Sequence, residues 1–148
     1  MIEFRNLQVV YDDAIEAVRD VSLQADKGAL VALLGSNGAG KSTMLKAMSG
    51  ILYAEEGKIN NGSIHLEVAD ISAFAPDEIV RRGVVHVPEG RRVFPALTVE
   101  ENLQVGGFTT SAAVWRERRD QAFELFPRLA ERRDQIAGYM SGGEQQML

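Results

Sequence analysis

The sequence contains no cysteine among its 148 residues, and it has no long apolar run. The first absence excludes disulfide bonds, thiolate metal sites and a cysteine nucleophile, and it is compatible with a reducing cytoplasm. The longest apolar run, Ala29–Leu34, is far shorter than the about 20 residues that a membrane-spanning helix needs. The first residues, Met1–Arg5, lack the basic and apolar regions of a signal peptide. Any role at a membrane is therefore expected to depend on a partner.

Basic residues are also scarce. The chain has 16 Lys and Arg against 21 Asp and Glu, which gives a formal net charge of -5. A nucleic-acid-binding surface is normally basic, so we expect no nucleic-acid partner. Hydrophobic residues make up 45% of the chain and charged residues 25%, which is typical of a globular domain, and the length fits one domain.

The order of strand-like and helix-like patterns predicts an α/β domain. Residues 1–25 alternate between apolar and polar side chains, which predicts an antiparallel hairpin. Leu30–Leu34 and Val84–Val87 are continuous apolar runs, typical of strands buried on both faces. Asn61-Gly62 lies between two short strand-like runs and predicts a second hairpin. From about residue 99 to 140 the pattern is helical, which predicts a helical subdomain.

A glycine-rich loop carries the strongest chemical signal. Gly35-x-x-x-x-Gly40-Lys41-Ser42 matches the P-loop pattern in full, between a buried strand and a helix. Glycines let the backbone approach a ligand closely, and successive N–H groups with the helix N-terminus form an anion site. Lys41 is expected to reach the β- and γ-phosphates, and the Ser42 hydroxyl to ligate Mg²⁺. The predicted nucleotide site comprises Gly35, Ser36, Asn37, Gly38, Ala39, Gly40, Lys41, Ser42 and Thr43.

A second feature is the run Ser141-Gly142-Gly143-Glu144, which has the form of a helix capping box. Two glycines just inside a helix start cost about 1 kcal/mol each. One interpretation is simply a well-capped helix, and the other is a phosphate that approaches bare backbone. The residues alone leave both interpretations open.

Together, Gly35–Thr43 and Ser141–Gln146 resemble the Walker A and signature motifs of ABC-transporter ATPases. Met140 stands where the family usually has leucine. The run Val87–Pro95, followed by Leu97–Leu103, is similar to the ATPase subunits of branched-chain amino acid importers and of related urea or amide importers. The resemblance covers the whole chain.

The resemblance implies an ABC-type nucleotide-binding domain over residues 1–148, with ATP and Mg²⁺ as its ligands. Its fold would be a P-loop NTPase core with an N-terminal antiparallel β subdomain and a helical subdomain. Two such ATPase chains sandwich ATP, and the pair drives an integral membrane permease from the inner face of the plasma membrane. The signature residues that would act on a partner's ATP are Ser141, Gly142, Gly143, Glu144 and Gln145.

The resemblance also implies roles for two single residues. Tyr11 matches the aromatic residue that stacks on adenine, a contact that contributes about 1–3 kcal/mol. Without the resemblance, a strand-end tyrosine in the core is an equally good interpretation of Tyr11. Glu89 stands where most members carry the Q-loop glutamine, which senses Mg²⁺ and the γ-phosphate and contacts the permease. A carboxylate there accepts a hydrogen bond from a metal-bound water but cannot donate one.

In this family an apolar strand follows the signature helix and ends in an Asp that helps hold Mg²⁺, with a catalytic Glu and a switch His after it. None of these is found before Leu148. We therefore expect an N-terminal fragment of a longer ATPase, incomplete at its C-terminus and lacking strands beside the P-loop strand. This fragment is expected to bind nucleotide without hydrolysing it, and to contain no catalytic residue of its own.

Two other hypotheses compete with an importer subunit. Some proteins with both motifs are soluble ABC-type ATPases that act in translation or repair without a permease. An unrelated P-loop kinase or GTPase would leave Ser141–Gln146 unexplained, and a GTPase would carry an Asn-Lys-x-Asp motif that this sequence lacks.

Overall fold

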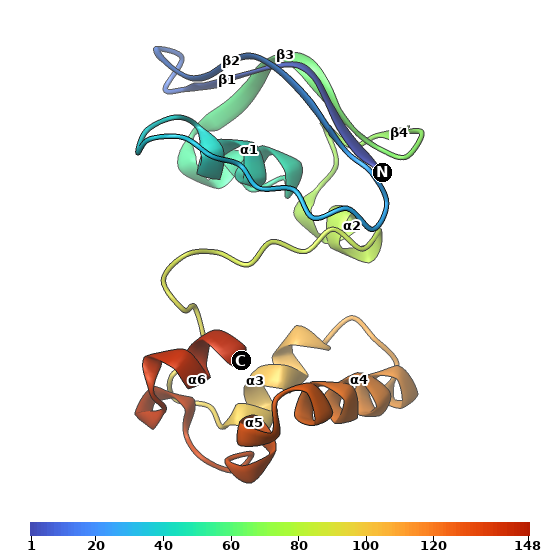
Figure 1. Ribbon diagram of the computed structural model, residues 1–148, viewed down its shortest axis with the longest axis vertical. Coiled ribbons are helices and arrows are strands. Elements are labelled where there is room, and N and C mark those ends of the chain that lie inside the picture. Colours follow the sequence, from blue (N-terminus) through green and yellow to red (C-terminus); the bar gives the residue numbers. More distant parts are fainter. The chain divides into compact units, whose positions relative to one another are not determined.

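The computed structural model describes all residues from 1 to 148. They form two compact units, unit 1 from Met1 to Val87 and unit 2 from Pro88 to Leu148 (Figure 1). Unit 1 contains the sheet, and unit 2 is built from helices and connecting loops. None of the helices combines the length and the apolar content needed to cross a membrane.

The sheet of unit 1 has four strands in the order β2-β1-β3-β4, and every neighbouring pair is antiparallel. The strands are β1 (Ile2–Tyr11), β2 (Ile15–Ala25), β3 (Gly57–Leu66) and β4 (Ala69–Asp70). The hairpin predicted over residues 1–25 is confirmed, with Tyr11 opposite Ile15 at its closed end. Asp12 and Asp13 form its turn with φ values of 51° and 56°, a conformation that Asp tolerates better than most residues.

The second hairpin, predicted at Asn61-Gly62, is wrong. β3 runs straight through these residues and pairs along its length with β1, whose register shifts between Arg5 and Gln8. Gly62 has a φ of 83°, and a Cβ atom there would lie 2.3 Å from the carbonyl oxygens of Arg5 and Asn6. The glycine therefore belongs to a bulge that lets two backbones approach each other. Asn61-Gly62 has the sequence of a hairpin turn, but the strand that contains it pairs with β1, which lies far away in the sequence.

Three helices complete unit 1: α1 (Lys41–Met48), the 3-10 helix η1 (Leu52–Glu55) and α2 (Pro76–Arg81). α1 buries Met44 and Ala47 against the sheet, and these contacts fix the helix that follows the glycine loop. The buried core of sheet and helices comprises Phe4, Leu7, Val9, Val18, Met44, Ala47, Leu52, Ile64 and Ile71.

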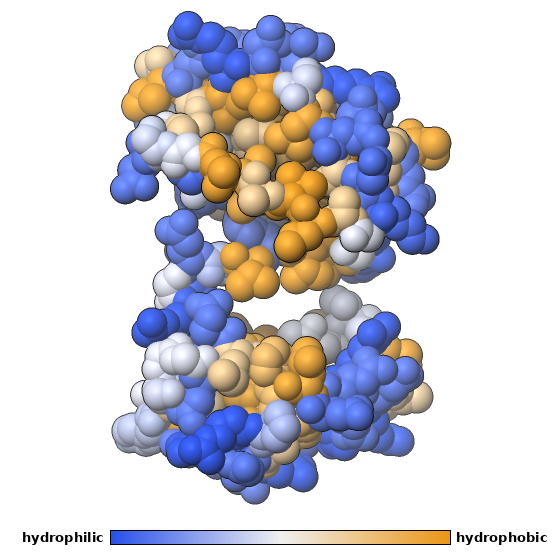
Figure 2. Space-filling view, in the orientation of Figure 1, coloured by the Kyte–Doolittle hydropathy of each residue, from blue (hydrophilic) through white to orange (hydrophobic).

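The two strands predicted at Leu30–Leu34 and Val84–Val87 are also wrong. Neither segment is a strand, and no other segment pairs with either of them. Their side chains are largely exposed, with Leu30 at 100%, Leu34 at 91%, Val85 at 68% and Val87 at 73%. Figure 2 shows apolar surface on the face of unit 1 where the segment after β2 runs in Figure 1. A buried parallel strand needs neighbours that bind its backbone, and residues 1–148 supply none here.

Unit 2 contains α3 (Val99–Gly106), α4 (Ala112–Leu125), α5 (Pro127–Glu131), the 3-10 helix η2 (Ala137–Tyr139) and α6 (Gly142–Met147). Its small core comprises Val99, Leu129, Ala137 and Met140. Thr98 and Glu101 form a reciprocal capping box at α3, with the Thr98 amide donating to Glu101 Oε2 at 2.7 Å. Pro127 begins a new helix instead of continuing α4, because proline cannot donate the next helical hydrogen bond.

Two glycine substitutions separate backbone strain from steric clash in unit 1. Gly28 and Gly62 both have positive φ, 79° and 83°, but a Cβ atom at Gly28 would meet nothing within 4 Å. We expect Gly28→Ala to cost about 1–2 kcal/mol from the left-handed conformation alone. Gly62→Ala should cost clearly more, because its Cβ atom also meets two carbonyl oxygens. Urea unfolding measures both free energies, and equal losses would contradict the close approach at Gly62.

Candidate functional site

The glycine loop lies between residue 34 and the start of α1, and its conformation depends on two glycines with positive φ. Gly38 and Gly40 both have a φ of 83°. Gly40 is buried, and a Cβ atom there would lie 2.6 Å from the Ala17 carbonyl oxygen and 3.0 Å from Val18 Cγ2. Only glycine fits at this position, because a side chain would clash with β2 and the φ is positive. The close approach holds the end of the loop on the sheet, whereas residues 35–39 remain exposed.

Lys41 closes the loop from the helix side. Its Nζ donates to the Gly35 carbonyl oxygen at 2.9 Å and to the Ser36 carbonyl oxygen at 2.7 Å. An ammonium has three donors, so one remains for a ligand, and no carboxylate forms an ion pair with it. The charge is therefore held over the loop without being neutralised by the protein. This is the arrangement expected of a site for anionic oxygens.

The donor set for a metal ion is small. Asp, Glu and His residues form no cluster of three or more that could hold a metal. Ser42 is exposed on the first turn of α1, and Thr43 beside it is half-buried. Mg²⁺ takes oxygen ligands and keeps several waters, often with phosphate oxygens as ligands. One hydroxyl next to a phosphate loop therefore fits Mg²⁺ that arrives with a nucleotide.

Tyr11 is half-buried at the end of β1 and combines features of both interpretations. A Cβ atom at Gly57 would lie 2.7 Å from Tyr11 Cε1, so the ring rests on the glycine backbone and packs beside the core. Its partner on β2 is Ile15, two to three residues before the Ala17-Val18 seat of Gly40. At about 3.3 Å per residue, Ile15 lies about 7–10 Å along β2 from Ala17 and Val18, the two residues that Gly40 contacts.

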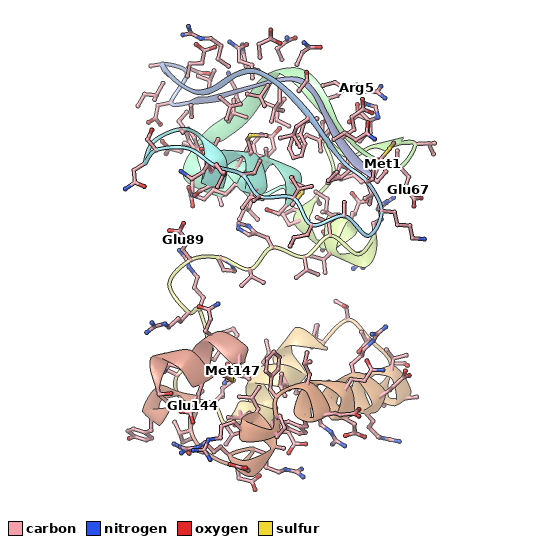
Figure 3. All side chains as sticks on the ribbon, viewed as in Figure 1. Met1, Arg5, Glu67, Glu89, Glu144 and Met147 are labelled. Carbon is pink, nitrogen blue, oxygen red and sulfur yellow. The ribbon has the colours of Figure 1, made fainter.

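Glu89 lies in unit 2 on the segment before α3, where Figure 3 labels it. Its side chain is exposed and forms no ion pair in the structure. Further along, this segment is anchored to α3 by Asn102, which accepts from the Phe94 amide at 2.7 Å and donates to the Phe94 carbonyl at 3.0 Å. The predicted role of Glu89 stays a prediction.

The signature run forms the capping box predicted from its sequence. Ser141 Oγ accepts from the Glu144 amide at 3.4 Å, and Glu144 Oε2 accepts from the Ser141 amide at 2.8 Å and from Ser141 Oγ at 2.7 Å. Glu144, labelled on α6 in Figure 3, also pairs through Oε1 with Arg132 Nε at 3.2 Å. Gln145 Nε2 donates to the Ala137 carbonyl oxygen at 3.0 Å and ties α6 to η2. The hydrogen bonds from Ser141 have the largest effect in holding the pKa of Glu144 below its usual value, and the charges of Arg132 and Arg128 add a smaller one.

The two signature glycines have different surroundings. A Cβ atom at Gly142 would lie 2.2 Å from Arg91 Nη1 and 2.6 Å from Arg91 Cζ. At Gly143 a Cβ atom would meet nothing within 4 Å, and its φ is not in the left-handed region. The guanidinium of the exposed Arg91 side chain therefore lies against the bare backbone of Gly142. Nothing inside the chain requires a glycine at position 143.

The sequence analysis missed three contacts that shape these sites: Ala17-Val18 under Gly40, Gly57 under the Tyr11 ring, and Arg91 on Gly142. Each joins residues far apart in the sequence, so no local pattern marks it. Glycine is unfavourable inside a strand or helix, so its presence there indicates that another group lies close to the backbone. It does not indicate which residue that group belongs to.

Comparison with known proteins connects both sites to one family. The model of the family described as ABC transporter matches residues 18–148. The high-affinity branched-chain amino acid transport ATP-binding protein BraG of Pseudomonas aeruginosa is 47% identical over 148 residues, all of this chain and 61% of that protein. A probable branched-chain amino acid transport ATP-binding protein, LivF of Archaeoglobus fulgidus, is 35% identical over 87% of this chain and 52% of its own length. The chain thus spans about half to three fifths of these relatives.

Solved structures agree with the sequence relatives. An ATP-binding subunit of an ABC transporter has a TM-score of 0.80 at 30% identity, covering 99% of this chain and 58% of the other. A dimeric bacterial ABC transporter cassette has a TM-score of 0.78 at 25% identity, covering 99% of this chain and 66% of the other. The predicted fold class, a P-loop NTPase core with an antiparallel β subdomain and helices, is confirmed by these neighbours. The chain belongs to the ABC transporter family of ATP-binding proteins.

Proposed function

We propose that this chain is the N-terminal part of the ATP-binding subunit of an ABC importer. The complete subunit couples ATP hydrolysis to the uptake of branched-chain amino acids or a similar small solute. The observation that carries the proposal is the closed glycine loop, with Gly40 seated on β2 and Lys41 over the loop carbonyls. The transport named for the relatives supports an importer over a soluble ATPase of translation or repair.

In this proposal the loop Gly35–Thr43 binds the phosphates of ATP. The exposed backbone of residues 35–39, which includes Gly38 with its positive φ, would form the anion site, and Lys41 supplies a charge that no carboxylate neutralises. The Ser42 hydroxyl would hold the Mg²⁺ that accompanies ATP. When bound, Mg²⁺ neutralises charge on the phosphate oxygens.

Tyr11 stacks on the adenine. The ring is braced by the Gly57 backbone, and Ile15, the partner of Tyr11 on β2, lies two residues before Ala17, which Gly40 contacts. The ring and the end of the loop therefore lie near the same end of the β1-β2 hairpin. Because the brace is backbone and not a mobile side chain, the ring is held ready for stacking.

Ser141 to Gln145 act on ATP that a second ATPase subunit holds. Gly143 supports this role, because the chain itself gives no reason for a glycine there and a phosphate at bare backbone would. The dimeric cassette among the structural neighbours is consistent with such a pair. Residues from about 99 to 140 form a helical subdomain that carries this surface within the nucleotide-binding domain.

Glu89 would occupy the Q-loop position, where its carboxylate could accept a hydrogen bond from water held by Mg²⁺ and contact an integral membrane permease. Its exposure and freedom from ion pairs leave the carboxylate available for either contact. Through the permease the subunit would lie at the cytoplasmic face of the plasma membrane. The residues that complete hydrolysis are not among residues 1–148, so we propose that this chain binds ATP without hydrolysing it.

Lys41→Ala tests the proposed ATP site. Loss of a charge-assisted hydrogen bond costs about 1.5–3 kcal/mol, so the Kd for Mg·ATP should rise about 10- to 100-fold. Calorimetric titration of the chain with Mg·ATP measures the change. Lys27→Ala, at an exposed turn residue with no ion pair, is the matched control and should leave Kd unchanged. Equal affinities of wild type and Lys41→Ala would refute the proposed site.

The signature capping box should respond to acid. The pKa of Glu144 is held below its ordinary value of 4.5, first by the Ser141 hydroxyl and amide and then by Arg132 and Arg128. Its contribution to the stability of α6 is therefore complete above pH 4.5 and lost as the pH falls through the lower folded-state pKa. An NMR titration of the Glu144 carboxyl carbon should give a midpoint below 4.5. Glu144→Gln should remove the acid dependence of the α6 amides, and a midpoint at or above 4.5 would contradict the capping box.

A further inference from the structure

Arg91 and the signature motif form a contact that the proposed function does not use. The guanidinium lies directly on Gly142, since a Cβ atom at this position would meet Nη1 at 2.2 Å, Cζ at 2.6 Å and Nη2 at 3.0 Å. Any other residue at position 142 would push the guanidinium away. The missing side chain of Gly142 thus provides the seat for the Arg91 cation.

The backbone around Arg91 is built to present this side chain. Gly90 and Arg91 have φ values of 91° and 51°, and the Val93 amide donates to the Arg91 carbonyl oxygen at 2.8 Å. A few residues later the segment is fixed to η2, where the Gly138 amide donates to the Pro95 carbonyl at 2.9 Å. Gln145 of α6 also binds η2. The segment that carries Arg91 and the helix that carries Gly142 are therefore attached to the same element of unit 2.

The charge of Arg91 is left without an acidic partner. Four other arginines of unit 2 form ion pairs with carboxylates, namely Arg119, Arg128, Arg132 and Arg133. Arg91 forms neither an ion pair nor a side-chain hydrogen bond, although Glu144 follows its seat by two residues and pairs with Arg132 instead. An exposed guanidinium on a backbone seat, with all its donors free, is suited to an anion from outside the chain.

We propose that Arg91 binds the γ-phosphate of the ATP that the signature motif receives from the opposing subunit. This inference rests on the proposed function, in which Ser141 to Gly143 face that nucleotide. Arg91 would add a planar, bidentate donor and a full positive charge beside the open backbone of Gly143. Because ADP lacks the γ-phosphate, the contact would make association of two subunits depend on ATP.

The test measures ATP-dependent association of the complete subunit by sedimentation equilibrium, with the β,γ-imido analogue of ATP to prevent turnover. Arg91→Ala should raise the dimer dissociation constant about 10- to 100-fold, as loss of a charge-assisted hydrogen bond predicts. Nucleotide affinity of the isolated subunit should be unchanged, because the Walker A loop is intact. Arg92→Ala is the matched control, since Arg92 is also exposed and unpaired, and it should associate like wild type.

Three further measurements separate phosphate binding from a purely structural role. Arg91→Lys should retain much of the association, because the charge remains. Gly142→Ala, which displaces the guanidinium and also alters the signature run, should weaken association at least as much as Arg91→Ala does. With ADP in place of the analogue, wild type and Arg91→Ala should behave alike.

Each other outcome overturns the proposal. Wild-type association that Arg91→Ala leaves unchanged refutes the role of Arg91 and leaves the proposed function standing. Equal losses in Arg91→Ala and Arg92→Ala indicate a general charge effect and also refute it. Normal association with loss of permease binding assigns Arg91 to an acidic group of the permease. A wild-type subunit that neither binds the analogue nor associates with it contradicts the proposed function itself, and the inference with it.

Discussion

The close contact of Gly40 with β2 is the interaction on which the proposed nucleotide site depends. Gly40 has a φ of 83°, and a Cβ atom at this position would lie only 2.6 Å from the Ala17 carbonyl oxygen. This contact fixes the residue that precedes α1, so the first turn of α1 and the Lys41 side chain point back at the loop. Met44 and Ala47 then anchor the helix in the core of unit 1. The geometry of the loop and the position of Lys41 thus depend on this close approach and on the packing of α1 in the core.

Unit 2 also contains a glycine whose bare backbone another group contacts closely, at Gly142. Gly142 accepts the Arg91 guanidinium where a side chain would exclude it, and Glu144 binds Ser141 and Arg132 to hold the helix start. Gly143 beside it is open. In both units another group lies close to the bare backbone of a glycine. The approaching group is a strand carbonyl in unit 1 and a cation in unit 2, and the surface left exposed in each case suits phosphate.

Features that depend on neighbouring residues could be predicted from the sequence, and features that depend on distant ones could not. The hairpin of β1 and β2, the capping boxes at Thr98 and Ser141, and the glycine loop all follow from local spacing. Asn61-Gly62 has the local form of a hairpin but forms a bulge, because β1 pairs along both sides of it. Leu30–Leu34 is apolar enough for a buried strand, yet no strand in residues 1–148 pairs with it. The pattern of apolar residues indicates the environment that suits a segment. It does not indicate whether a neighbouring strand is present to pair with it.

The most direct test of the central claim is to measure ATP binding and phosphate release by the 148-residue chain in one preparation, with Mg²⁺ present. The P-loop should bind ATP, since its loop, lysine and hydroxyl are all in place. Phosphate release should not exceed that of Lys41→Ala, because we propose that the groups that orient and activate water are not among residues 1–148. Sustained, Mg²⁺-dependent release that Lys41→Ala abolishes would show that residues 1–148 already contain a complete catalytic site, and it would contradict the claim.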